Sequence, residues 1–310
     1  MNPQIKGNVM MFVAKTFSGL NQNALRYLLP NWMSAQTGVF LRLGAGSLLF
    51  LVYELFVGHK FPRPSLKDTA ILLLTGLVFV FGYMWTLLEG LTYTTPISSS
   101  IFISLQPVFV FIICLIIRTE KATLKKIGGM LLGFGGALLC VLTQHGSDVA
   151  SDPLKGNLLC LCGAVLYSGY LVTEKKYIPR YGSAMVSFLT FGGGAIGSII
   201  LVCFTGWDAS VLHQDLFSTP MLVLLFVLLF PSFLSYLLQD FSLNLLSATV
   251  VALYSDLILI VSAIASYVLG QDHFSWWQIG AICLMLMSVY LVENSESAAK
   301  STPISTPAQH

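Results

Sequence analysis

The sequence predicts an all-α membrane protein in which ten transmembrane helices form two inverted five-helix repeats. Three observations support this fold class. Of the 310 residues, 55% are hydrophobic and only 10% are charged, whereas soluble domains carry roughly 25% charged residues. The apolar residues are gathered into runs long enough to cross a bilayer. The sequence pattern at the start of the chain also recurs about half a chain later.

Apolar runs of membrane-spanning length follow one another along the whole chain and leave no room for a separate soluble domain. A helix needs about 20 apolar residues to cross a hydrocarbon core of about 30 Å. Strands of a membrane barrel would alternate over about 10 residues, but these runs are long and continuously apolar. Spans are expected at 7–29, 34–57, 69–90, 96–117, 124–143, 156–177, 183–205, 219–241, 246–268 and 275–293.

The repeat relates the two halves of the chain. The triplet Lys-Gly-Asn at 6–8 recurs at 155–157, and Pro30 recurs as Pro179, in both cases 149 residues later. Five spans in each half make the second copy enter the membrane from the opposite side, which is the pattern of transporters that work by alternating access. Duplication that only builds a stable bundle is the alternative. The expected parts are a first repeat at 1–147, a second repeat at 148–294 and a disordered polar tail at 295–310.

The distribution of Lys and Arg predicts the orientation, because cytoplasmic loops are enriched in both. With the N-terminus inside, 12 of the 16 basic residues fall on the cytoplasmic side and 2 outside. The protein is therefore expected in the inner (cytoplasmic) membrane of the cell, with both termini in the cytoplasm. The bilayer is the expected surrounding partner. The net charge of +2 gives no reason to expect a nucleic-acid partner.

Short motifs in both halves resemble the EamA family of the drug/metabolite transporter superfamily. In the first two spans the family pattern is matched by Gly19, Asn21, Arg26, Pro30 and Arg42. At the entry to the fifth span it is matched by Glu120, Gly129 and Gly136. The sequence departs from the family where Ser18 replaces the usual Trp and Gln271 replaces a usual Glu. The resemblance implies a permease for small organic metabolites, amino acids or related compounds, working as an exporter.

Polar side chains at membrane depth are the strongest indicators of a site, because a charge at the helix centre costs about 2.5–3.5 kcal/mol on insertion scales. Lys15 and Asp256 are the deepest basic and acidic side chains. They could form a ligand or proton site, or they could form a static ion pair. Helical spacing places further polar residues on the same inward faces. The residues expected to bind a small amphipathic substrate are Lys15, Gln22, Trp85, Thr86, Gln106, Tyr167, Tyr170, Tyr236 and Asp256.

Charged residues nearer the ends of the spans form two groups, one towards each side of the membrane. They could act as gates that close one side at a time, or they could simply anchor helix ends. The gating candidates are Arg26, Arg42, Glu89, Glu174 and Asp240. Glycines in the spans at 124–143 and 183–205 favour close helix packing, within one chain or, alternatively, in a homodimer.

Other function classes have little support. All five His fall in expected loops or the tail, and no zinc-protease or nucleophile-elbow motif is present, so an enzyme, a metal site and a cofactor are not expected. The six Cys lie in apolar runs and are expected to act as small hydrophobic residues. A channel lacks a visible filter sequence. A sugar-nucleotide or phosphate exchanger of the same superfamily would need several converging basic residues, and only Lys15 and Arg42 are deep.

Overall fold

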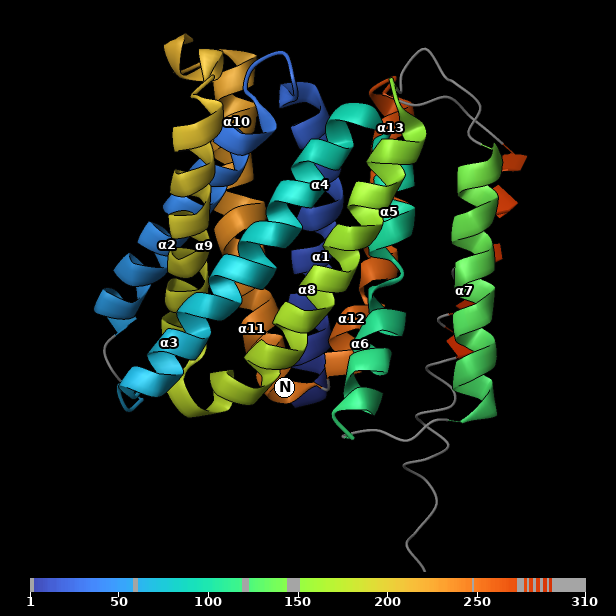
Figure 1. Cartoon of the computed structure of the whole chain (residues 1–310), viewed down its shortest axis with the longest axis horizontal. Coiled ribbons are helices and arrows are strands. Elements are labelled where there is room, and N and C mark those ends of the chain that lie inside the picture. Colours follow the sequence, from blue (N-terminus) through green and yellow to red (C-terminus); the bar gives the residue numbers. More distant parts are fainter. Residues whose placement is uncertain are drawn as a thin grey trace, which may run out of the picture.

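The structure, a computed structural model, describes residues 3–57, 61–118, 123–143, 151–246 and 248–271, together with short helical pieces between 276 and 291. Every regular element in these residues is a helix, and most helices run side by side in one bundle (Figure 1). Seven continuous helical runs are long and apolar enough to cross a membrane. The all-α membrane fold is therefore confirmed, and the number of ten spans stays a prediction.

The helices follow the same order in each half of the chain. The first half contains α1 (Pro3–Leu28), α2 (Ala35–Val57), α3 (Leu66–Thr75), the π-helical segment η1 (Gly76–Val80), α4 (Phe81–Tyr93), α5 (Pro96–Ile103), α6 (Gln106–Ile116) and α7 (Leu124–Thr143). The second half contains α8 (Pro153–Tyr181), α9 (Ser183–Thr205), the short 3₁₀ helix η2 (Ser210–His213), α10 (Thr219–Leu229), the π-helical segment η3 (Phe230–Leu234), α11 (Ser235–Leu245), α12 (Ala248–Leu253) and α13 (Ser255–Val268).

Irregularities recur at matching places in the two halves. The third run of each half contains a π-helical segment, η1 or η3, and the fourth run of each half is broken into two shorter helices. A π segment disturbs the regular hydrogen-bond ladder, and such segments are frequent at functional sites. The shared order and shared breaks support the two-copy architecture. The division at residues 147 and 148 remains a prediction.

Local sequence explains where several helices begin and end. Pro96 and Pro153 occupy the first helical turn, where the missing proline N–H costs nothing. The side chains of Thr95 and Asp152 cap these helices by accepting a backbone N–H from the first turn. Gly182, with φ of 80°, ends α8 in a conformation that favours glycine.

The two halves are interlocked rather than placed side by side. Helix α1 packs against α11 and α13 of the second half, and α8, its repeat partner, packs against α4 and α6 of the first half. Helix α2 packs along α9. Helix α7 stands at one edge of the bundle (Figure 1), where Ser288 Oγ donates to the Gly129 carbonyl oxygen at 2.6 Å. The first helix of each copy thus contributes to the core of the other.

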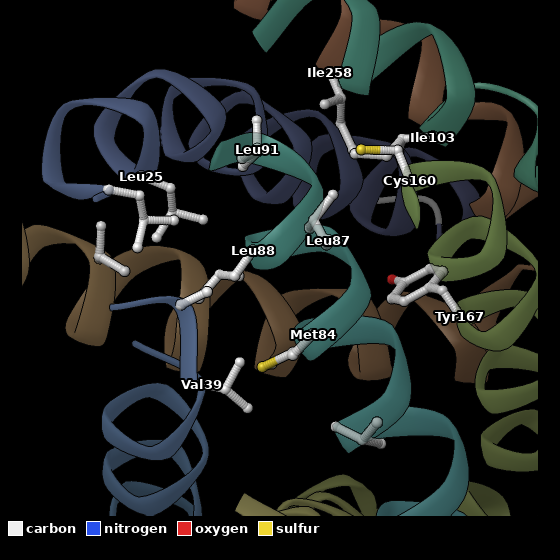
Figure 2. Close-up of a cluster of buried hydrophobic side chains, with 14 of the residues drawn as sticks. Leu25, Val39, Met84, Leu87, Leu88, Leu91, Ile103, Cys160, Tyr167 and Ile258 are labelled. Atoms are coloured by element: carbon white, nitrogen blue, oxygen red, sulfur yellow. The ribbon is translucent and has the colours of Figure 1, made fainter. Parts of the chain in front are cut away.

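An apolar core fills the bundle towards the side on which α1 ends. Met84, Leu88 and Leu91 on α4 point towards Leu25 of α1 and Val39 of α2 (Figure 2). All five side chains are buried. The same core extends to Ile103, Tyr167 and Ile258, which also border the polar cavity described below.

Candidate functional site

A polar cavity of about 30 Å³ lies at the middle of the bundle. It has room for about one or two water molecules and is far smaller than the roughly 300–1,000 Å³ of a typical ligand pocket. Nine elements contribute to its walls: α1, α2, α4, α5, α6, α8, η3, α11 and α13. Its lining consists of Ala14, Lys15, Ser18, Asn21, Gln22, Arg42, Tyr83, Ile103, Gln106, Tyr167, Pro231, Ser235, Tyr236, Gln239 and Ile258.

Lys15 is a buried cation held between the two halves. Its side chain is 3% exposed. The Nζ atom donates to Gln239 Oε1 at 2.8 Å and to Tyr167 Oη at 3.4 Å. Tyr167 also donates to the same Gln239 oxygen, at 2.5 Å. Both partners are neutral, so these bonds orient the ammonium group without cancelling its charge.

Arg42 is a second buried cation on the wall of the same cavity. Only 1% of the residue is exposed. Its Nε donates to Ser232 Oγ at 2.8 Å, and its Nη1 has no acceptor among the described atoms. No described acidic side chain forms an ion pair with Arg42 or Lys15. Because an unpaired buried charge is costly, two such cations favour a ligand that brings a negative charge.

Four tyrosines surround the cations. The rings of Tyr83 and Tyr167 lie 4.9 Å apart, and Tyr170 lies behind them, 5.7 Å from Tyr167. Tyr236 Oη donates to Tyr83 Oη at 3.1 Å. Lys15 Nζ lies 5.4 Å from the centre of the Tyr167 ring, within the range of a cation–π interaction. Aromatic faces with polar edges suit an amphipathic organic ligand.

Amide side chains supply unused hydrogen-bonding capacity. Gln106 Oε1 accepts from Ser255 Oγ at 2.7 Å, and Gln22 Oε1 accepts from Ser99 Oγ at 3.4 Å. Asn21 Oδ1 and Gln239 Nε2 are buried without a partner in the described structure. Buried polar groups are normally paired, so a free acceptor and a free donor at one cavity are available to a ligand or to water.

The cavity brings together five of the nine residues expected to bind substrate: Lys15, Gln22, Gln106, Tyr167 and Tyr236. Tyr170 lies one ring further out. Trp85 is 37% exposed and stacks on Phe81, and Thr86 bonds the Gly82 carbonyl oxygen within α4; neither borders the cavity. Position 256 lies in the first turn of α13, but the Asp256 side chain is outside the described residues.

Helix packing explains why Thr86 does not border the cavity. Gly82 and Thr86 lie on one face of α4, and Gly82, together with Gly163 of α8, allows the two helices to approach closely. A Cβ on Gly82 would lie 3.0 Å from a Leu166 methyl group, and a Cβ on Gly163 would lie 2.9 Å from Thr86 Oγ1. Helix α8 therefore covers this face of α4. Tyr83, the residue after Gly82, points from a different face and borders the cavity.

Six polar residues of the cavity were not among the expected binding residues: Ser18, Asn21, Arg42, Tyr83, Ser235 and Gln239. The helical face of Tyr236 includes Gln239, so periodicity alone could have added it. Asn21 belongs to the motif that resembles the family. Nothing in the sequence separates Tyr83 from the other tyrosines of the chain.

The gating candidates fall in three places. Arg42 lies in the cavity itself. Arg26 Nη1 donates to the carbonyl oxygens of Leu91 and Thr92, at 3.0 and 3.4 Å. Glu89 Oε1 accepts from Tyr93 Oη at 3.2 Å. Arg26 thus ties the end of α1 to the end of α4.

Glu174 and Asp240 are both fully buried and adjoin each other between α8 and α11. Neither pairs with a neighbouring lysine. Lys175 Nζ instead donates to the carbonyl oxygens of Leu243 and Leu246 at the end of α11. Lys176 is exposed at the end of the bundle. Ion pairs of Glu174 or Asp240 with these lysines are therefore absent from the described part of the chain.

A larger groove of about 1,000 Å³ lies between α3, α6 and α8. Its walls are mostly apolar, including Ile71, Phe79, Ile113 and Val165. Its polar lining includes Thr75, Thr173, Lys175 and Lys176. The small cavity is the stronger candidate for selective binding because buried basic, amide and tyrosine side chains from both halves converge on it.

The described residues contain no group of three or more His, Cys, Asp or Glu that could hold a metal ion. The described cysteines are free thiols, and Cys114 and Cys160 are buried.

Comparison with known proteins identifies the family. The model of the EamA-like transporter family matches residues 5–142 and again residues 154–293. The uncharacterized transporter YyaM of Bacillus subtilis is 25% identical over 90% of each chain. A thiamine-repressible mitochondrial transport protein, THI74 of Saccharomyces cerevisiae, is 24% identical over 76% of this chain and 67% of its own.

A solved crystal structure covers 96% of this chain and 99% of its own, with a TM-score of 0.66 and 15% identity. This likeness shows that the fold is shared. The two family matches coincide with the two series of helices, α1 to α7 and α8 onward. The chain is a multi-pass membrane protein and belongs to the EamA-like transporter family.

Proposed function

We propose that this protein is a permease of the cytoplasmic membrane that exports small organic compounds bearing a carboxylate, amino acids or close relatives, by alternating access. The observation that carries the proposal is the convergence of Lys15 and Arg42 on one buried cavity with no described acidic partner. A carboxylate would supply the missing negative charge. The tyrosines would receive the apolar part of the substrate, and the free amide atoms of Asn21 and Gln239 would bond its polar groups.

Alternating access is supported by the two repeats and by the size of the cavity. A cavity of about 30 Å³ is too small for an amino acid, so the halves must move apart to admit one. Inverted repeats provide two equivalent ways of doing so, one for each side of the membrane. The excess of Lys and Arg in the loops on the side of the N-terminus supports a cytoplasmic N-terminus.

The test is transport by the purified full-length protein in proteoliposomes. Labelled amino acids are compared with the corresponding amines, which lack the carboxylate, and with phosphorylated metabolites. We expect saturable uptake of amino acids and at least tenfold less uptake of the amines. That factor corresponds to about 1.4 kcal/mol, and a hydrogen bond to a charged group contributes at least about this much, roughly 1.5–3 kcal/mol. Preferential uptake of phosphorylated compounds would instead favour the exchanger.

Lys15→Met tests the residue assignment, and Lys176→Met is the matched control because Lys176 is exposed and does not border the cavity. Lys15→Met should lower uptake of amino acids at least tenfold, and the control should transport like the wild type. Equal transport by both variants, or equal transport of amines and amino acids, would contradict the proposed role of the cation.

A further inference from the structure

A second polar cluster lies beyond the cavity, towards the end of the bundle at which α8 finishes. Glu174 on α8 and Asp240 on α11 are its acidic members, and both have no exposed surface. Tyr170, also with no exposed surface, lies one helical turn before Glu174. Ser187 on α9 completes the cluster. Each of the three helices therefore contributes a buried polar group.

Most oxygen atoms of this cluster lack a hydrogen-bond partner in the described structure. Ser187 Oγ donates to Asp240 Oδ2. Asp240 Oδ1, both carboxyl oxygens of Glu174 and the Tyr170 hydroxyl have no partner of normal geometry. The two carboxyls and the hydroxyl nevertheless lie close enough to interact electrostatically. The Tyr170 hydroxyl is buried, lies beside Glu174 and has no other partner in the described structure, so it remains available as a donor to the carboxyls.

No described cation neutralises the two carboxyls. Lys175 is turned to the carbonyl oxygens at the end of α11, and Lys176 is exposed. Lys15 is bound to Gln239 and Tyr167, on the cavity side. Among the described residues, the other titratable groups that face the carboxyls are the hydroxyls of Tyr167 and Tyr170.

Two carboxyls in contact, buried and without a counter-ion, are not both ionised, because each negative charge opposes the other and neither is solvated. We propose that Glu174 and Asp240 hold one exchangeable proton between them, and that transport responds to pH through this pair. With the proton bound, one carboxylic acid donates to the other carboxylate. Release yields two carboxylates and one free proton, and their repulsion then acts between α8 and α11.

The position of the pair links it to the cavity. Tyr167, Tyr170 and Glu174 follow one face of α8, and α11 carries Tyr236 and Gln239 directly before Asp240. A change in the separation of α8 and α11 at the carboxyls therefore acts on the two helices that supply Tyr167 and Gln239 to the cavity. This coupling rests on the transport function proposed above, whereas the proton site itself does not.

Infrared spectroscopy of the full-length protein in phospholipid bilayers tests the site without any substrate. In the wild type, a carboxylic-acid C=O band should be lost as the pH is raised and should shift in D₂O. Asp240→Asn and Glu174→Gln should each remove this band. Asp215→Asn, at an exposed loop position, and Glu54→Gln, on α2, are matched controls that should keep it.

Ser187→Ala is a milder variant that keeps both carboxyls and should change the frequency of the band, because it removes the bond to Asp240. Absence of the band in the folded wild type, or its persistence in both carboxyl variants, overturns the proposal. Loss of the band on adding sodium at constant pH would also overturn it, by showing a metal cation in place of the proton.

Transport measurements separate this proposal from the proposed function. Asp240→Asn should abolish the dependence of amino-acid uptake on pH that the wild type shows. Uptake by the variant that keeps the wild-type pH dependence overturns the coupling. Failure of all uptake by a wild type that shows the infrared band would instead count against the proposed substrate, and would leave the proton site standing.

Discussion

The contact between α9 and the third run of the first half gives a sharp test of helix packing. A Cβ added to Gly193 would lie 2.0 Å from the Leu73 carbonyl oxygen and 2.8 Å from its carbonyl carbon. The reciprocal glycine, Gly76, is equally tight, because its Cβ would lie 1.9 Å from the Thr190 carbonyl oxygen. All of these obstructing atoms belong to the backbone. A change of side-chain rotamer therefore cannot relieve the clash.

The expected loss of stability follows from these distances. Real Cβ atoms essentially never approach a neighbour closer than 3.0 Å, so the Gly193 Cβ requires a displacement of at least 1.0 Å, the difference between 3.0 Å and 2.0 Å. Overpacking that side chains can relieve costs about 1–3 kcal/mol. Separating two backbones should reach the upper end, about 3 kcal/mol. At about 2–4 °C per kcal/mol, Gly193→Ala should lower the Tm by about 6–12 °C.

Gly44→Ala is the matched control. Gly44 lies inside α2, and a Cβ added there would meet no heavy atom within 4 Å. Alanine is favoured over glycine in a helix by about 0.8–1.0 kcal/mol, so this variant should unfold at the wild-type temperature or slightly above it. Both variants are compared with the wild type by thermal unfolding in the same detergent. A Gly193→Ala protein as stable as Gly44→Ala would refute the close contact between α9 and α3.

Three further predictions follow from the site and the topology. Tyr83→Phe should lower transport by roughly 3- to 10-fold, since one hydrogen bond contributes about 0.5–1.5 kcal/mol, whereas Trp85→Phe should transport normally because Trp85 stacks outside the cavity; equal effects would contradict this assignment. Arg180→Ala should change the free energy of unfolding by less than about 1 kcal/mol, because its side chain is 65% exposed; chemical denaturation measures this. In intact cells an impermeant thiol reagent should label Asp215→Cys but not Arg63→Cys, with the wild type as background; the reverse pattern would invert the proposed orientation.

The sequence was sufficient for the class of fold and for much of the site. Lipid provides no partners for exposed backbone groups, so long apolar runs must be helices. Lipid also excludes unpaired polar side chains, and the helical period assigns them to faces. Periodicity alone therefore places Lys15, Tyr167 and Tyr236 on inward faces, and the cavity contains all three.

Contacts between distant parts of the chain were decided only by the tertiary structure. The polar face of α4 that carries Thr86 and the polar face of α11 that carries Tyr236 occupy matching places in the two halves. Only the face of α11 borders the cavity. Glycines on the polar face of α4 and on α8 let these two helices approach until no space remains between them. Periodicity identifies a polar face, but it does not determine which helix will cover it.

The same limit applies to the charged residues. Arg42 was expected to act as a gate on one side of the membrane, but it lies in the wall of the cavity, where its long side chain reaches Ser232 in the other half. Glu174 is followed in sequence by two lysines, but the turn of the helix directs them elsewhere and places Glu174 against Asp240. Sequence alone determined which residues are buried in the membrane and on which faces they lie. The partner of each one was set by helix packing, because α2 packs against η3 at Arg42 and α8 packs against α11 at Glu174, which brings together side chains far apart in the chain.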